Sequence, residues 1–227
     1  RRKGAACHLG YVGVIGQQEG MDLLVAAIEH LVRRLGHDSL HVTVVGFGPQ
    51  LPVVQADVAA RGLASHFTFA GALYGDDLLD VLNSIDIGVS PDPRNAMNDI
   101  STMNKIMEYM TLEKPVVLFD LAEGRASAGA AARYARPNDP LDLAAQIDWL
   151  IRNPEDAAQM GRIGRARVLD RLEATPPVAV TGAAGPATPP RPFRWRDFAF
   201  GLLGYMGFGI GYIGYMTFVI ALLREQG

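Results

Sequence analysis

Lys105 and Glu108 are the charged side chains of this sequence that are best placed to do chemistry. They lie three residues apart in the segment 101–120, STMNKIMEYMTLEKPVVLFD, which has the pattern of a helix that runs into a buried strand. A lysine and a glutamate at this spacing on a helix usually form a surface ion pair worth about 0.2–0.5 kcal/mol. They could instead hold a ligand, because an ammonium attracts phosphate and a carboxylate accepts hydrogen bonds from hydroxyl groups. The elements that position the pair decide between these two interpretations.

The start of this helix is a candidate anion-binding site. Ser101 is a favourable N-cap for a helix that begins at Thr102, after a loop rich in proline, aspartate and asparagine that follows Ser90. The backbone N–H groups of a first helical turn have no partner within the helix and attract anions. We therefore expect a diphosphate to be held by the N–H groups of Thr102, Met103 and Asn104.

Two glycine-containing segments also lie where a predicted strand ends and a helix begins. They are GYVGVIGQQEG, with Gly10, Gly13 and Gly16, and VVGFGPQ, with Gly46 and Gly48. Ligands commonly bind at this edge of a parallel sheet, where glycine lets the chain turn tightly. Neither segment is a complete GxGxxG motif followed by an acidic residue, so a dinucleotide site is only weakly indicated. Each loop, taken alone, could equally be a turn that binds nothing.

Composition narrows the classes of partner and site. The chain has 227 residues, a net charge of −3 and a pI of about 6.0, so it lacks the basic field typical of proteins that bind nucleic acid. Cys7 is its only cysteine, which excludes an internal disulfide framework and fits a reducing compartment. No HxxxH spacing suggests zinc, and we expect no metal and no cofactor.

Short β-rich runs alternate with amphipathic helices up to residue 172, which predicts an α/β domain: a Rossmann-like parallel sheet with helices on both faces. Leu24, Ile28 and Leu31 form one apolar helical stripe, and Leu143 and Ile147 belong to a second. The expected strands are residues 9–15, 41–45, 66–70, 86–90, 115–119 and, with the weakest pattern, 131–135. The first residue is Arg1 with no signal peptide before the first strand, so we expect a fragment of a longer protein.

The composition changes after residue 172. Residues 173–196 are rich in proline, glycine and alanine and predict a linker, and residues 197–227 contain a stretch without charge, 198–223, that is long enough to cross a bilayer. Gly207 and Gly211 form a GxxxG pair of the kind that packs membrane helices. The alternative is a buried helix or hairpin of a soluble domain. Arginines before this stretch favour a bacterial inner-membrane protein with its globular domain in the cytoplasm.

From about residue 9 to residue 172 the sequence resembles the C-terminal, donor-binding domain of bacterial family 4 glycosyltransferases, which have two Rossmann-like domains in the GT-B arrangement. The segments that carry the resemblance are YVGVIG, VTVVGFGPQLPVV, HFTFAGALYGDDLLDVLNSIDIGVSPDP, NDISTMNKIMEYMTLEKPVVLFDLAEGRASAGAAARYARPND and MGRIGRARV. The fourth is the most specific and is similar to the branch that builds surface polysaccharides.

This resemblance implies metal-independent transfer of a sugar from a nucleotide sugar to a saccharide or lipid-linked acceptor, with retention at the anomeric carbon. Glu108 stands at the second carboxylate of the family's E-x7-E motif, which binds the ribose hydroxyls of the donor. The backbone at Thr102 and Met103 would meet the diphosphate and Gly16 would line it. The turn after Gly71, at Ala72 and Leu73, would face the base. No residue of the chain is assigned a catalytic role.

Two positions depart from the family pattern. Ile100 replaces the first carboxylate of E-x7-E, and whether the adjacent Asp99 substitutes for it is open. Glu19 stands where the family has a basic residue that offsets phosphate charge, so Lys105 is the alternative source of that charge. We therefore expect donor binding to be weaker than in the family or differently arranged, and little sugar transfer without the acceptor domain.

The tail has a resemblance of its own. The segment LLGYMGFGIGYIGYMTFVIALLREQG is similar to the first transmembrane helix of sugar-transporter-like members of the major facilitator superfamily (MFS). Two alternatives to a membrane-tethered glycosyltransferase half follow. One is the opening part of an MFS transporter fused to a remnant of a transferase domain, and the other is a noncatalytic, membrane-anchored binding module.

Overall fold

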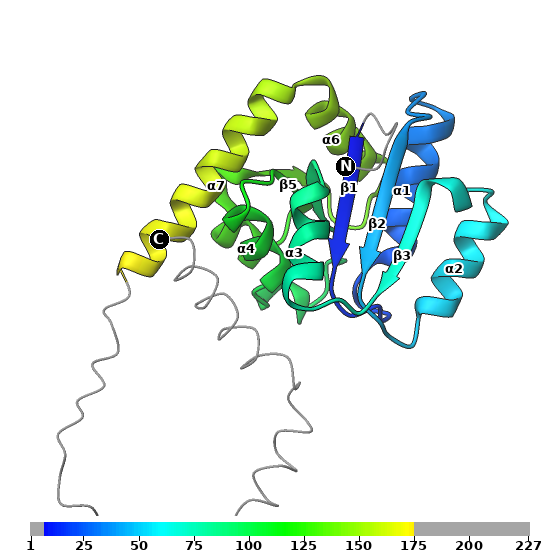
Figure 1. Cartoon of the computed structure of the whole chain (residues 1–227), viewed down its shortest axis with the longest axis horizontal. Helices are drawn as coiled ribbons and strands as arrows, with labels where there is room; N and C mark the ends of the chain where they lie inside the picture. Colours follow the sequence, from blue (N-terminus) through cyan, green and yellow to red (C-terminus); the bar gives the residue numbers. More distant parts are fainter. Residues whose placement is uncertain (1–6, 175–227) are drawn as a thin grey trace, which may run out of the picture. The chain divides into compact units, whose positions relative to one another are not determined.

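The computed structural model describes residues 7–174 and contains a parallel sheet (Figure 1). The strand order is β3-β2-β1-β4-β5-β6, and every neighbouring pair is parallel. Each strand overlaps a predicted one, which confirms the expected α/β class and its six strand positions. The strands are β1 (Cys7–Val12), β2 (Leu40–Val45), β3 (Phe67–Gly71), β4 (Ile87–Ser90), β5 (Val116–Phe119) and β6 (Ala132–Ala135).

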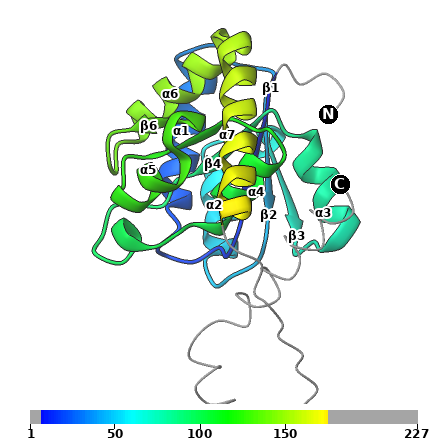
Figure 2. The same cartoon turned by 90° about the vertical axis from the view of Figure 1, so that its left-hand side faces the viewer.

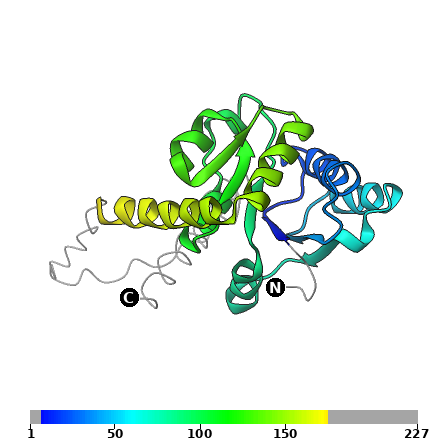
Figure 3. The ribbon, with the colours of Figure 1, turned by 90° about the horizontal axis from the view of Figure 1, so that it is seen from above.

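Helices join successive strands and cover both faces of this sheet, as parallel connections require. The view from above separates α1 and α2 from the long α7 (Figure 3). The helices are α1 (Met21–Arg33), α2 (Leu51–Ala60), α3 (Gly75–Ser84), α4 (Asn104–Thr111), α5 (Ala122–Ala128), α6 (Pro140–Arg152) and α7 (Pro154–Ala174), with short 3-10 turns η1 (Ala64–His66), η2 (Asn98–Ile100) and η3 (Gly129–Ala131).

One face of the sheet packs against α1, α2 and α6. Leu24, Ile28 and Leu31 of α1 and Leu143 and Ile147 of α6 are fully buried there, so the two apolar stripes predicted from the sequence do face the sheet. Asp139 caps α6 by accepting hydrogen bonds from the backbone N–H groups at the start of that helix.

The opposite face packs against α3, α4, α5 and α7. Ile106, Tyr109 and Met110 of α4 are fully buried in this second cluster, together with Val116 and Leu118 of β5. Helix α7 runs beside α4 (Figure 2), and the Arg165 guanidinium donates to the carbonyl of Thr111 at the end of α4. Packing on both sides therefore fixes the direction in which α4 presents its first turn.

The strand order reverses direction between β1 and β4. β1 pairs with β2 on one side and with β4 on the other, so the loops that follow β1 and β4 leave the sheet toward opposite faces. In open parallel sheets a crevice forms at this point, outside the carboxyl ends of the strands.

The predicted tail falls outside this description. No helix within residues 7–174 is long and apolar enough to cross a bilayer. The expected membrane stretch 198–223 and residues 175–196 of the expected linker lie beyond the described residues. Helix α7 continues to Ala174, past the domain boundary expected at residue 172.

Candidate functional site

Two loops at the carboxyl edge of the sheet, one after β1 and one after β4, are fastened to each other. The buried Asn98 side chain donates to the carbonyl of Gln18 at 3.0 Å and to the carbonyl of Pro93 at 2.9 Å, and so bridges the loops. Gly20 has φ 63°, and a Cβ atom there would stand 2.0 Å from the carbonyl oxygen of Pro91. Glycine is therefore required at this position for the loops to approach.

A cavity of about 350 Å³ lies between these loops and the start of α4. It brings together most of the residues that the sequence predicted for the site: Ser101, Thr102, Met103, Asn104, Lys105 and Glu108. Gly13, from the first of the two glycine segments considered above, and Glu19, which was expected near the phosphates, also line it. The remaining lining residues were not predicted to meet a ligand, namely Val12, Val14, Asp92, Met97 and Asn98.

Lys105 forms its ion pair with Asp92 and not with Glu108. Its Nζ lies 2.8 Å from Asp92 Oδ1 and 2.9 Å from Oδ2, and both side chains are buried, 9% and 4% exposed. The Ser90 hydroxyl donates to Asp92 Oδ2. The Lys105 ammonium also lies 5.1 Å from the centre of the Tyr11 ring, a cation–π contact. The surface Lys–Glu pair considered from the spacing is therefore absent, and a buried pair across the cavity wall takes its place.

Glu108 presents a carboxylate oxygen without a partner. Its Oε2 is inaccessible to solvent and makes no hydrogen bond within residues 7–174. Burial raises the pKa of Glu108 to about 7, and the nearby Lys105 only partly opposes this shift. An unpartnered, buried acceptor is costly unless a donor arrives, so Glu108 is suited to accept a hydrogen bond from a ligand.

Glu19 gives the cavity a second carboxylate oxygen, Oε2, that is buried and lacks a hydrogen-bond partner among the described residues. A Cβ atom on Gly16 would stand 2.6 Å from this oxygen, so the absence of a side chain at Gly16 makes room for Glu19. The cavity therefore contains carboxylates from Glu19, Asp92 and Glu108, and within residues 7–174 Lys105 is the only cationic side chain that lines it.

Tyr109 holds the β1 strand against α4 behind the cavity. Its hydroxyl accepts from the N–H of Val12 at 3.0 Å and donates to the carbonyl of Gly10 at 3.1 Å. The ring packs on Gly88, where a Cβ atom would stand 2.3 Å from it. Burial raises the pKa of Tyr109 well above its ordinary value, so the hydroxyl stays protonated. These contacts fix the position of the cavity floor.

The start of α4 differs from the prediction. The helix begins at Asn104 with Met103 at the N-cap, and Ser101 is not the cap, because the 3-10 turn η2 precedes it and its hydroxyl donates to the carbonyl of Met97 at 2.6 Å. The Thr102 hydroxyl donates to Glu123 Oε1 at 2.7 Å. Within residues 7–174 no acceptor meets the N–H groups of Thr102 and Met103, which keeps them available to an anion.

The glycines of the second loop make backbone contacts. A Cβ atom on Gly46 would stand 1.8 Å from the carbonyl oxygen of Gly13, and one on Gly48 would stand 2.3 Å from that of Ile15. The N–H of Ile15 in turn donates to the carbonyl of Phe47 at 2.9 Å. Gly46 and Gly48 therefore let the first two loops pack together and do not line the cavity described above.

Three other predicted residues also lie away from this cavity. Gly16 lines a neighbouring cavity of about 450 Å³ between the starts of α1 and α2. Ala72 and Leu73 follow β3, at the end of the sheet beyond β2, and do not line the cavity beside Glu108. Their expected contact with a base stays a prediction.

The Asp99 side chain interacts with groups outside the cavity. Its Oδ1 accepts from the N–H of Ala122 at the start of α5, at 2.9 Å, and its Oδ2 lies 3.5 Å from the Arg94 guanidinium. The neighbouring Ile100 is 79% exposed and does not line the cavity. The structure therefore places no carboxylate from this pair of positions in the cavity.

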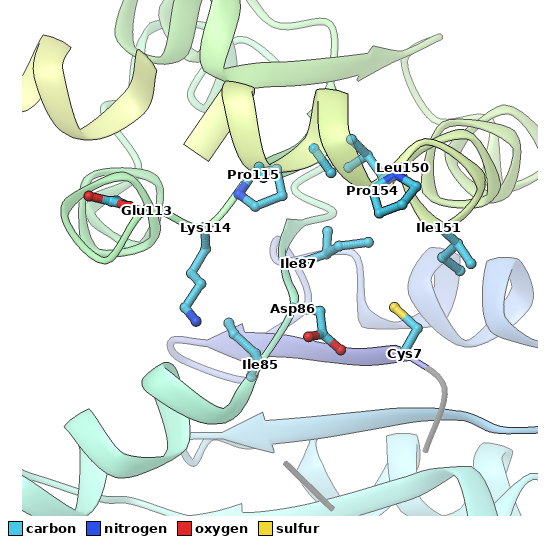
Figure 4. A pocket seen from close by; sticks show the side chains of 12 residues that line it. Cys7, Ile85, Asp86, Ile87, Glu113, Lys114, Pro115, Leu150, Ile151 and Pro154 are labelled. Carbon is cyan, nitrogen blue, oxygen red and sulfur yellow. The ribbon is translucent and has the colours of Figure 1, made fainter. Parts of the chain in front are cut away.

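A further cavity of about 340 Å³ lies at the opposite, amino edge of the sheet (Figure 4). Lys114 and Asp86 reach toward it, and Cys7 lies at one end. Lys114 Nζ donates to the carbonyl of Asn83 at 2.9 Å, and burial lowers its pKa. The sequence reasoning assigned no ligand to this cavity. Within the described residues, no group of histidine, cysteine, aspartate and glutamate side chains has the geometry of a metal site.

Comparison with known proteins adds the family context. Residues 6–153 match the family model described as glycosyl transferases group 1. Among curated proteins, a 2-deoxystreptamine glucosyltransferase from Streptomyces kanamyceticus is 26% identical over 166 residues, which is 72% of this chain and 41% of that protein. This chain thus spans about two fifths of the length of that relative.

Solved structures share the fold. The catalytic domain of cholesterol-alpha-glucosyltransferase from Helicobacter pylori has a TM-score of 0.63 at 19% identity, over 74% of this chain and 99% of that one. HepE from Anabaena, in complex with UDP and glucose, has a TM-score of 0.63 at 17% identity, over 72% of this chain and 44% of that one. At these identities the likeness concerns the fold.

Proposed function

This chain belongs to the glycosyl transferases group 1 family, and from that premise we propose that residues 7–174 bind the nucleotide-sugar donor of a glycosyl transfer reaction. The proposed site is the cavity between the loops after β1 and β4, at the reversal of strand order where open parallel sheets bind ligands. The HepE structure, which contains UDP, supports a nucleotide as the ligand class.

The buried Oε2 of Glu108, which has no hydrogen-bond partner within residues 7–174, is the observation that carries this proposal. Two adjacent ribose hydroxyls can each donate a hydrogen bond to one carboxylate, and a buried acceptor gains most from such donors. The N–H groups of Thr102 and Met103, which meet no acceptor among the described residues, lie at the same cavity and would meet the diphosphate. A nucleotide with its ribose on Glu108 and its phosphates at the start of α4 would provide donors to the carboxylate and an acceptor to the N–H groups.

The finer features of the reaction are proposals that rest on the resemblance stated above. They are retention at the anomeric carbon, independence of a metal, and a saccharide or lipid-linked acceptor of the surface-polysaccharide type. Because this chain spans 41% of its curated relative, we propose that the acceptor is bound by a part of the protein outside these residues. Residues 7–174 would then bind a donor and transfer little sugar, since a closed cleft between two domains excludes water and aligns the reactants.

Attachment to a membrane is a separate proposal. The uncharged stretch 198–223 would cross the bacterial inner membrane and leave residues 7–174 in the cytoplasm. Alkaline carbonate extraction of membranes from cells that express the full chain tests it. Retention of the protein in the membrane pellet is expected, and its complete release would contradict the proposal.

Calorimetric titration of the full chain with UDP, GDP and their glucose conjugates tests the donor site. We expect saturable binding of at least one nucleotide and a loss of about tenfold or more in affinity in Glu108→Ala, because the ribose hydroxyls lose a charged acceptor. Glu155→Ala is the matched control, since Glu155 is an exposed glutamate at the start of α7 and outside the cavity. Absence of binding, or equal affinities in both variants, would overturn the proposal.

A further inference from the structure

Asp92 forms an ion pair with Lys105, the ammonium group that a phosphate in this cavity would need. Both of its carboxylate oxygens lie within hydrogen-bond distance of Lys105 Nζ, at 2.8 and 2.9 Å. The Ser90 hydroxyl donates to one of these oxygens, and Asp92 is itself 3% exposed. A buried carboxylate held in this way cannot turn toward solvent, so the charge of Lys105 is compensated before any ligand arrives.

The rest of the cavity does not restore a positive charge. Glu19 and Glu108 contribute further carboxylates, and within residues 7–174 no second cationic side chain lines the cavity. Arg94, the nearest arginine along the β4–α4 loop, pairs with Asp99 and does not line it. A diphosphate would therefore depend on backbone N–H groups and on whatever share of Lys105 it can take from Asp92.

We propose that Asp92 is a positioning residue that sets specificity: by holding Lys105 it withholds the ammonium from the phosphates, so that the cavity resists highly charged ligands. The inference rests on the proposed function, because it concerns the same nucleotide site. It implies that the uncharged nucleoside contributes most of the affinity. It also implies that a nucleotide sugar, whose terminal phosphate is esterified, binds better than the more highly charged free nucleoside diphosphate.

A gain in affinity for UDP when the charge of Asp92 is removed distinguishes this proposal from a purely structural role for Asp92. Asp92→Asn keeps the shape of the side chain and removes its charge, which leaves Lys105 free to pair with phosphate. We expect UDP to bind the Asp92→Asn variant of this chain about tenfold more tightly than the wild type, with uridine affinity unchanged. A merely structural role for Asp92 would lower the affinity for both ligands.

Calorimetric titration of each variant with UDP and with uridine is the experiment. Glu19→Gln is the matched control, because it removes a negative charge from the same cavity without releasing Lys105, and its gain should be smaller. Adding Lys105→Met to Asp92→Asn should abolish the gain. Ser90→Ala, which removes the hydroxyl that holds Asp92, should give an intermediate gain and decides the matter if Asp92→Asn does not fold.

The outcomes separate this inference from the proposed function. Binding of UDP by the wild type without a gain in Asp92→Asn or Ser90→Ala would overturn the role of Asp92 alone. An equal gain in Glu19→Gln, or a gain that survives Lys105→Met, would also overturn it, since the total charge and not Lys105 would then be responsible. No binding of UDP, GDP or their glucose conjugates by any folded variant would overturn the proposed function and this inference with it.

Discussion

The raised pKa of Glu108 makes a quantitative prediction about stability. Burial raises this pKa from 4.5 to about 7, so the folded protein disfavours the ionised carboxylate while the unfolded chain does not. Glu108 releases its proton at lower pH in the unfolded state than in the folded state, so this group reduces the stability of the fold as the pH rises from 4.5 through 7. At 1.36 kcal/mol for each pKa unit, the complete effect is about 3 kcal/mol.

Glu108→Gln removes this titration and keeps the size of the side chain. We expect the variant to be more stable than the wild type, by about 1 kcal/mol at pH 5 and by about 3 kcal/mol at pH 8. Other acids with shifted pKa values, such as Asp120 and Glu123, whose pKa values are lowered by hydrogen bonds to Arg125 and Thr102 respectively, contribute equally to both proteins. Their effects therefore cancel in the difference.

Urea unfolding of the wild-type chain and of the Glu108→Gln chain at a series of pH values between 5 and 8 is the assay. A difference in unfolding free energy that stays constant over this range would refute the burial argument, because only a shifted pKa makes the difference depend on pH. UDP-glucose, which has no phosphate group that titrates in this range, provides the second readout. Its affinity should rise about tenfold from pH 6 to pH 8 in the wild type and stay flat in the variant, since hydroxyl donors prefer the ionised carboxylate.

Three further predictions concern the frame of the site. Gly46→Ala places a Cβ atom 1.8 Å from a backbone oxygen and should lower the unfolding free energy by about 3 kcal/mol or more. Gly36→Ala is its control and should cost about 1 kcal/mol, because Gly36 has a positive φ but open space around it. Tyr109→Phe should cost about 1–3 kcal/mol, because the N–H of Val12 loses its partner, whereas Tyr74→Phe at an exposed site should cost less than about 0.5 kcal/mol. Both pairs are measured by urea unfolding, and equal costs within a pair would contradict the reasoning. Nucleotide affinity should be the same with and without EDTA in calorimetry, and a loss of affinity in EDTA would contradict the expectation that binding needs no metal.

The periodicity of the sequence was sufficient to predict the sheet. Short β-rich runs predicted the six strands to within a few residues, because a buried strand needs an apolar run, and the run that forms β6 had the weakest pattern. The stripes through Leu24 and Leu143 predicted α1 and α6, two of the helices that cover one face. Helix starts were harder to predict. Ser101 has the chemistry of a cap, but the preceding residues 98–100 form a 3-10 turn that moves the start of α4 to Asn104.

The site was predicted only in part. Glu108 and Lys105 follow from the motif, and both line the cavity. The prediction that Gly46 and Gly48 lie at the ligand was wrong for this cavity. These glycines let one backbone segment pack on another, and in a sequence a glycine needed for packing looks the same as a glycine in a ligand-binding turn. Asp92 left a weak signal as one of two aspartates in the loop after Ser90, and nothing in its spacing from Lys105 shows that the two meet.

The sequence by itself determined the type of the elements and their order along the chain, because these depend on local pattern. The role of Glu108 as a ligand-binding carboxylate comes from the resemblance and stays a prediction. The tertiary structure decided that Lys105 pairs with Asp92, that Glu19 and Glu108 each keep a buried oxygen without a partner, and that Asp99 turns to α5. The physical reason is that the segment after β4 brings Asp92 back to Lys105, 13 residues later, while the pairing of β1 with β4 places Glu19 at the same cavity. Electrostatic partners depend on distances between segments that lie far apart in the chain, and residue spacing along the sequence does not contain those distances.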